Sequence, residues 1–359
     1  MSLNKLFRTW QTNKRRVLNL QAGLARRKLQ PVREKFYHDL WATSAQKIGA
    51  TFEEFPGGLV RISKDGLATF VSESDLMLDS ALTLRVFADK SLHYQMMASK
   101  ALRMPKFLRF TLSTISEAEV FRASQIGPVV VKPADGTGGG RGVITGINSH
   151  AKLVAASRHA AGFNRNLLVE EQLTGACFRL LFLNGQFLDA VRRDSPSVVG
   201  DGQTNIAKLV RRENAARINL KEISALSPLI IDRESRNTLF IDGRTVSSIP
   251  RSDQKVRVKL AINENGSAQN HIVRTDVHPE IVDTGERLVR DFGIKFAGLD
   301  ITSDDISAPL SEGDTRFNEI NVNPGIHHHY LVANPEQSAD VAPMLLERMF
   351  EQRIGTIRV

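Results

Sequence analysis

The chain has 359 residues, of which 42% are hydrophobic, so it can bury a large core and its length indicates two or three domains. No apolar stretch approaches the roughly 18 residues that span a bilayer, and the N-terminus lacks the apolar core of a signal peptide. The single cysteine, Cys177, excludes an intrachain disulfide and fits a reducing compartment, so we expect a cytoplasmic protein without a membrane span.

The net charge of +9 is concentrated at the N-terminus. Residues 1–36 hold ten lysines and arginines against one acid, Glu34, whereas the rest of the chain is balanced at 38 against 38. Such a segment could meet nucleic acid, an acidic lipid surface or an acidic substrate. We favour a solvated helical face instead, because charge runs usually are solvated faces. The apolar positions expected to pack beneath it are Leu6, Trp10, Val17, Leu18, Leu20 and Leu24.

Helices and strands are expected to interleave along the whole chain, which indicates an α/β or α+β class. The predicted helices span residues 1–50, 74–87, 89–102, 150–161, 279–292 and 338–352, with a capping box at 116–119 opening another. The predicted strands span 59–62, 68–71, 128–132, 143–147, 166–170, 178–183, 186–192, 296–301 and 316–322. Asn184-Gly185 is a strong hairpin signal. The stretch 211–262 is polar and predicts no clear element.

A glycine-rich loop joins two of these strands. The apolar run 127–131 ends in Lys132, and five glycines follow within residues 136–142. Glycine lets the backbone approach an anion, and successive N–H groups form an anion-binding concavity, with Lys132 and Arg141 adding charge. Because a strand follows the loop, the pattern differs from both common phosphate-binding loops. It predicts a nucleotide triphosphate site, and a glycine-rich hairpin with a chance lysine is the alternative.

Three oxygen-bearing side chains stand on strands near the C-terminus. Glu319 and Asn321 are two residues apart, so they point to one face, and Asp300 lies in an apolar strand where a bare carboxylate is costly. Such ligands suit Mg²⁺, although strand-end carboxylates bonded to neighbouring backbone are the alternative. The histidine run 327–329 is not expected to bind one metal ion, because neighbours on a strand alternate faces. We expect these histidines to face substrate or to be structural.

The order of these motifs resembles the ATP-grasp superfamily. It runs from a lysine before the glycine loop through Val-Glu-x-x-Leu and Ala-Gly-Leu-Asp to Glu-x-Asn-x-Asn-Pro-Gly. The chain looks most like the ATP-grasp portion of cyanophycin synthetase and of bifunctional glutathione synthetases. The resemblance covers roughly residues 75–330, in blocks at 88–90, 131–136, 168–175, 178–181, 192–202 and 277–281.

The resemblance implies an α+β ATP-grasp fold, in which two α+β subdomains grip ATP, with a basic helical N-terminal extension. The implied domains are 1–88, a small helical or α+β domain, 89–165, the subdomain with the glycine-rich lid, and 166–359, the subdomain with the metal site. The phosphate contacts would be Lys90 and Lys132, with Gly138, Gly139 and Gly140 closing over them. The hinge holding adenine through backbone groups would be Glu170, Glu171, Gln172 and Leu173.

The same resemblance implies that Asp300, Glu319 and Asn321 hold Mg²⁺ or Mn²⁺. Arg193 and Asn323, with Arg179 as a further candidate, would face the acyl phosphate or substrate. Cys177 stands where cyanophycin synthetases tend to carry an Asp that contacts ribose. The Mur-ligase-like domain of those enzymes has no counterpart in this sequence, so we do not expect cyanophycin polymerisation.

The implied activity is that of an ATP-dependent, ADP-forming carboxylate–amine ligase of the acid–amino-acid ligase type. It would form an amide or peptide bond through an acyl phosphate, on amino acid or peptide substrates. The alternatives are a non-catalytic ATP-grasp-like binding protein and a basic nucleic-acid-associated protein. The intact carboxylate set with two lysines speaks against a degenerate, non-catalytic site. Nucleic acid is not an expected partner. A homodimer is left open.

Overall fold

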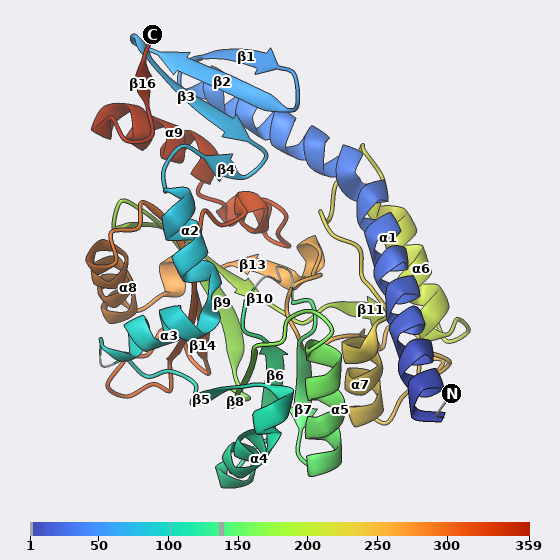
Figure 1. Cartoon of the computed structure of the whole chain (residues 1–359). Coiled ribbons are helices and arrows are strands. Elements are labelled where there is room, and N and C mark those ends of the chain that lie inside the picture. The colour runs from blue at the N-terminus through green and yellow to red at the C-terminus, as the bar shows by residue number, and fades with distance from the viewer. Residues whose placement is uncertain (1–2, 101, 136–139) are drawn as a thin grey trace.

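The computed structural model describes residues 3–100, 102–135 and 140–359, and side chains from residue 23 onward. Its long first helix, α1 (Leu3–Lys47), is followed by an antiparallel sheet in the order β1 (Thr51–Phe55), β2 (Leu59–Lys64), β3 (Leu67–Ser72) and β16 (Ile357–Arg358), while β4 (Asp75–Leu76) also pairs with β3. The last helix, α9 (Val341–Gln352), packs against α1, and Tyr37 and Trp41 of α1 are buried in this core. The C-terminus therefore lies beside the first sheet (Figure 1).

A four-stranded antiparallel sheet carries the glycine-rich segment. Its order is β5 (Phe107–Phe110), β8 (Leu167–Glu171), β6 (Val129–Pro133) and β7 (Ile144–Ile147). Helices α4 (Ile115–Ser124) and α5 (His150–Ala160) bury their apolar residues against it. Because β8 pairs with both β5 and β6, this sheet crosses the predicted domain boundary at residues 165/166.

A second, five-stranded antiparallel sheet carries the acidic residues. Its order is β13 (Asn270–Ile272), β10 (Gln186–Arg193), β9 (Ala176–Leu183), β14 (Phe296–Ser303) and β15 (Arg316–Val322). Helix α8 (Pro279–Asp291) packs on β9 and β10, while α2 (Ala81–Ala88) and α3 (Lys90–Ala98) contact β15. The hairpin predicted at Asn184-Gly185 is confirmed, with both residues at positive φ as a tight two-residue turn requires. All the described sheets are antiparallel, so the predicted α+β class is confirmed.

The stretch that the sequence left unassigned forms a small unit with its own core. Helices α6 (Ile206–Arg217) and α7 (Arg233–Ile241) and the strand pair β11 (Ser197–Val199) with β12 (Lys255–Arg257) surround it. The core residues are Val198, Ile206, Leu209, Val210, Leu229, Leu239, Val256 and Val258. Helix α7 lies against β7 of the four-stranded sheet. The expectation of no clear element holds for most of residues 211–262, but it missed α7, β12 and the end of α6, because the apolar residues there are spread too thinly to give a visible period.

Several predicted helix boundaries were also wrong. Helix α2 begins at Ala81 rather than at 74, because Asp79 accepts hydrogen bonds from the N–H groups of residues 295 and 296 and Ser80 caps the helix. The capping box at 116–119 does not form, and Thr111 with Thr114 makes one instead. Leu24, expected to pack beneath α1, is 49% exposed. Within the described residues, no helix is apolar and long enough to cross a membrane.

Candidate active site

The largest cavity described lies between the four-stranded and five-stranded sheets and has a volume of about 1090 Å³. Strands β6, β7 and β8 line one side of it, and β9, β10, β14 and β15 line the other. The predicted site residues that reach it are Lys90, Lys132, Gly140, Glu170, Glu171, Gln172, Leu173, Arg179, Arg193, Asp300, Glu319 and Asn321. Gly138 and Gly139 lie outside the described residues. The structure therefore gathers most of the predicted residues around one space.

The three predicted metal ligands share one face of the β14–β15 pair. Asp300 lies directly opposite Glu319 in the ladder, and Gly298 lies opposite Asn321. The amide nitrogen of Asn321 donates to Asp300 Oδ2 at 3.1 Å. Two carboxylates and one amide oxygen are a donor set that Mg²⁺ or Mn²⁺ accepts, so the residues present fit the expected ion. Among the described residues, no group of three or more His, Cys, Asp or Glu side chains could hold a metal by itself.

Both carboxylates are already paired with cations. Arg179 grips Asp300 with two parallel hydrogen bonds, from Nε at 2.6 Å and from Nη2 at 2.7 Å. Glu319 accepts a hydrogen bond from the ammonium group of Lys90. Burial alone would raise the pKa of Glu319, but Lys90 and then Lys132 outweigh it and hold that pKa at about 2. Both carboxylates are therefore held in fixed positions, where a metal cation can also bind them.

Lys132 sits in a buried polar triangle at the start of the glycine-rich segment. Its ammonium group donates to the hydroxyl of Tyr94 at 2.9 Å and pairs with Glu170 Oε2 at 2.6 Å. The Tyr94 hydroxyl in turn donates to the same carboxylate at 3.0 Å. Burial, then the charge of Glu170, raises the pKa of Tyr94, so it stays a neutral donor. Sequence reasoning missed Tyr94, because one aromatic residue inside a helix gives no signal of its own.

Arg193 differs from the other charged groups because it has no acidic partner among the described residues. Its side chain is 8% exposed, and Nη2 contacts only the carbonyl of Ile262 at 3.2 Å and Nε2 of His328 at 3.4 Å. Its Nε is buried without any hydrogen-bond partner. Burial, then repulsion from Arg179, lowers the pKa of Arg193 to about 10. A buried cation in this state is a strong site for an anion.

The predicted adenine hinge closes one end of the cavity. The N–H groups of Glu171 and Gln172 donate to the carbonyls of Lys106 and Pro128, at 2.9 and 3.1 Å. Glu170 is paired in the strand ladder on both sides. Gln172 also accepts from the N–H of Gly146 at 2.6 Å, which ties the hinge to β7. Most hinge backbone groups are thus engaged within the protein.

Some predicted residues lie elsewhere. Asn323 is not among the cavity residues, since its amide donates to Asp75 at 3.2 Å and its backbone has a positive φ of 53°. The histidine run lies on the 3₁₀ helix η4 (Ile326–His329), so the alternating-strand premise was wrong. His327 and His328 line the cavity, whereas His329 is fully buried and contacts Asp189 at 2.8 Å. That His327 and His328 face substrate stays a prediction.

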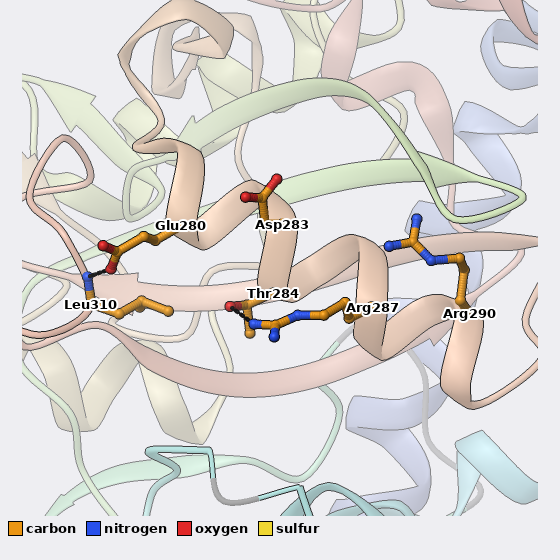
Figure 2. Close-up of a pocket in the computed structure, with 6 residues that line it drawn as sticks. All are labelled: Glu280, Asp283, Thr284, Arg287, Arg290 and Leu310. Carbon is orange, nitrogen blue, oxygen red and sulfur yellow. Dashed lines mark hydrogen bonds between the residues drawn. The ribbon is translucent and has the colours of Figure 1, made fainter.

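A second, smaller hollow lies along α8, and Figure 2 shows the side chains that surround it. Its volume is about 470 Å³. Glu280 accepts a hydrogen bond from the N–H of Leu310 at 3.0 Å, and Arg287 donates to Thr284 at 3.1 Å. None of the residues predicted to carry chemistry lines this hollow. The cavity between the two sheets is therefore the candidate active site.

Two sheets that enclose a cavity lined by lysines and carboxylates form the ATP-grasp fold. The bifunctional glutathione synthetase of Pasteurella multocida superposes with a TM-score of 0.52 at 19% identity, covering 86% of this chain and 43% of that one. A likeness at this identity establishes the fold alone. The predicted fold, with its helical N-terminal extension, is confirmed.

Sequence comparisons point to the relatives expected from the motifs. Cyanophycin synthetase of Trichormus variabilis is 32% identical over 206 residues, which is 56% of this chain and 22% of that protein. The bifunctional glutathione biosynthesis protein of Clostridium perfringens is 23% identical over 254 residues, 70% of this chain and 32% of its own length. The chain thus spans about a fifth to a third of these curated relatives. No family model matches it.

Proposed function

We propose that this protein is an ATP-dependent, ADP-forming carboxylate–amine ligase that acts on amino acid or peptide substrates. Its relatives are named as synthetases of cyanophycin and glutathione, and the fold is the one in which a nucleotide is gripped between two sheets. The observation that carries the proposal is Arg193, a buried cation without an acidic partner, in the same cavity as two lysines and the Asp300–Glu319 pair.

ATP would enter with its phosphates toward Lys90 and Lys132 and its adenine toward the hinge. Since the N–H groups of Glu171 and Gln172 already donate within the protein, the backbone contact to adenine falls to Leu173. Gly140 has a positive φ of 66°, which an L side chain rarely adopts, so it can bring backbone close to the phosphates. The role of Gly138 and Gly139 in closing over the phosphates stays a prediction.

Asp300, Glu319 and Asn321 would hold Mg²⁺ or Mn²⁺. A bound divalent cation would neutralise phosphate charge and hold the phosphates in place. For their part, Arg179 and Lys90 hold the two carboxylates in their orientations. Lys90 can turn from Glu319 to a phosphate oxygen once a cation takes over that carboxylate, because its four-carbon stem is flexible.

In the first half-reaction, a substrate carboxylate oxygen attacks the γ-phosphorus of ATP, and the bond to the bridging oxygen of ADP breaks. In the second, an amine attacks the acyl carbon, phosphate leaves with the carbon–oxygen electron pair, and the amine nitrogen gives up a proton. Arg193 would hold the negative oxygens that both steps share. Catalysis of this kind is positioning plus electrostatic stabilisation and needs no covalent protein nucleophile.

The test is a screen of phosphate release from ATP over pairs of amino acids and short peptides, with ADP and AMP separated to define the products. ADP formation that depends on both a carboxylate and an amine would support the proposal. Absence of turnover over the whole panel, with intact ATP binding, would favour a non-catalytic binding protein. Steeply salt-dependent binding to RNA or DNA would favour a nucleic-acid-associated protein.

Three further expectations stay predictions. The domains 1–88, 89–165 and 166–359 would be the N-terminal domain and the two halves that grip ATP. A cytoplasmic location is proposed from the single cysteine. Size-exclusion chromatography with light scattering would decide whether the protein is a homodimer.

A further inference from the structure

The first helix reaches the wall of the active-site cavity, although it lies outside residues 75–330, which carry the family resemblance. Arg33 of α1 and the neighbouring Ser74 both line the cavity. Tyr37, one turn further along α1, is buried, and its hydroxyl lies 3.0 Å from Nδ1 of His327, another cavity residue. The second half of α1 is therefore part of the site as well as part of the N-terminal core.

A continuous series of contacts joins α1 to Arg193. The guanidinium carbon of Arg33 lies 5.2 Å from the centre of the Tyr37 ring. Tyr37 contacts His327, whose ring centre lies 4.0 Å from that of His328, and His328 Nε2 lies 3.4 Å from Arg193 Nη2. The packing here is close, since a Cβ on Gly325 would come within 2.8 Å of the His327 ring. These side chains form one wall, which we call the α1 wall: Arg33, Tyr37, His327, His328 and Arg193.

Arg33 is held in place by its contact with Glu73. Its Nε donates to Glu73, whose carboxylate also accepts from Gln30 at 2.9 Å, and whose carbonyl accepts from the Trp41 indole at 2.8 Å. Three side chains of α1 thus fix Glu73. Among the described residues, the two Nη nitrogens of Arg33 have no hydrogen-bond partner. Its outer fork is therefore oriented and available to a planar anion, the geometry in which guanidinium groups recognise carboxylates.

The charge of the α1 wall is positive. Burial, then Arg33 and Arg193, lowers the pKa of His327 well below its usual range, and burial, then His327, does the same for His328. Both imidazoles are therefore neutral near pH 7 and serve as hydrogen-bonding groups. Glu73 offsets part of the Arg33 charge, whereas Arg193 has no acid beside it. The wall thus keeps a net attraction for an anion.

We propose that the α1 wall is a subsite for a non-reacting carboxylate of the substrate, which Arg33 binds while Arg193 holds the reacting end. The substrate class is then a molecule with a second carboxylate several bonds from the reacting group, such as a short peptide that has an Asp or Glu side-chain carboxylate to react and a free C-terminus, or a long dicarboxylic acid. Tyr37 is a positioning residue that fixes His327. This inference rests on the proposed ligase function for its catalytic test, and on binding alone for its second test.

The first test uses Arg33→Gln in the full chain, with Arg26→Gln as the matched control. Arg26 is exposed on the same helix, two turns before Arg33, and does not line the cavity. Phosphate release is measured on short peptides that carry one Asp or Glu side chain as the reacting carboxylate, each as the free C-terminal acid and as the C-terminal amide. Wild type and Arg26→Gln should prefer the acids. In Arg33→Gln, the KM for the acids should rise about tenfold, while the amides and the KM for ATP change little.

Tyr37→Phe keeps the packing of the ring and removes only the hydroxyl. It should raise the KM for the acids with little change in kcat, because His327 loses its fixed orientation. A purely structural role for Tyr37 would instead lower the melting temperature and leave the acid-to-amide preference unchanged. Equal preference for acids and amides in the wild type, or an unchanged preference in Arg33→Gln, would overturn the proposal.

The second test needs no turnover, so it separates this proposal from the proposed function. Thermal shifts are measured with dicarboxylates from succinate to suberate and with their monoamides, in the presence of a non-hydrolysable ATP analogue. At least one dicarboxylate should stabilise the wild type more than its monoamide does. That excess should vanish in Arg33→Gln and persist in Arg26→Gln. No excess in the wild type, or an excess that survives in Arg33→Gln, would overturn the subsite even if the ligase reaction is found.

Discussion

Two walls of one cavity handle their charges in opposite ways. On the wall that carries the predicted phosphate contacts, which we call the paired wall, Lys90 pairs with Glu319 and Lys132 pairs with Glu170. On the α1 wall, Arg193 has no acidic partner among the described residues, and Arg33 pairs with Glu73 through its Nε. On the first wall these charges are neutralised in pairs before a ligand binds, whereas the second wall keeps a net positive charge.

The difference indicates which kind of ligand each wall is suited to bind. Paired groups stay ordered before a ligand arrives, and a metal–nucleotide complex brings both signs of charge, so it can replace both partners of each pair. An unpaired buried cation gains only from an anion. We therefore assign the metal and nucleotide to the paired wall, and the substrate oxygens to the α1 wall.

The largest expected effect comes from removing a carboxylate on the paired wall. Glu319→Gln or Asp300→Asn should abolish ADP formation while leaving the circular dichroism spectrum unchanged, because each removes an expected ligand of the divalent ion. Glu312→Gln, at an exposed position away from the cavity, is the control and should keep full activity. Undiminished phosphate release in both variants would contradict the assignment of the metal ion to this wall.

The next effect comes from a lysine on the same wall. Lys132→Ala should lower kcat about a hundredfold, equivalent to about 3 kcal/mol, because one preorganised charge on the transferring phosphoryl group is lost. Lys106→Ala is the control, since Lys106 is exposed and only its backbone contacts the hinge. Similar small losses in the two variants would contradict the assignment of Lys132 to the phosphates.

A comparison of two arginines tests the contrast through stability. Arg179→Met leaves Asp300 without its bidentate partner, so we expect a loss of about 2 kcal/mol in the free energy of unfolding. Arg193→Met removes a buried cation that has no acid, so the ligand-free protein should gain about 1 kcal/mol while losing activity. Denaturant titration measures both. Losses of equal size would mean that the two walls are not different in this respect.

Part of the paired wall could be predicted because its residues sit in short, local patterns, whereas Lys90 and Glu170 were implied only by the family resemblance. The period of two on a strand put Glu319 and Asn321 on one face, and the ladder then placed Asp300 opposite Glu319. The hairpin at Asn184-Gly185 and the helix that begins at Pro279 followed from turn and cap chemistry. Such features depend on neighbours within a few residues, so they can be read from one chain.

The α1 wall could not be predicted in the same way. Tyr37 and His327 are 290 residues apart, and they meet because α9 and β16 return the end of the chain to the N-terminal core. For the charge run on residues 1–36 we favoured a solvated face over an acidic partner, which holds for Arg26 but not for Arg33, because Arg33 lines the cavity. Most of the small unit at 197–258 gave no clear element for a different reason, since its core takes few apolar residues from each element.

The smallest expected effect concerns a buried histidine behind the paired wall. His93 is fully buried, neither ring nitrogen has a hydrogen-bond partner, and its ring meets that of Tyr94 edge-on at 4.8 Å. Burial lowers the pKa of His93 to about 4 from an ordinary value of 6.5. The unfolded chain therefore binds this proton more readily than the folded chain. The free energy of unfolding should fall as the pH drops from 6.5 towards 4, by about 2 kcal/mol between pH 7 and pH 5 for this group alone.

His93→Phe removes the titrating group, so its stability should depend less on pH over that window, even if the larger ring costs some stability at pH 7. Denaturant titrations at pH 5, 6 and 7 measure the slope, with His150→Gln as a control at an exposed histidine. A slope that is equally steep in His93→Phe and in the wild type would show that the acid sensitivity lies elsewhere.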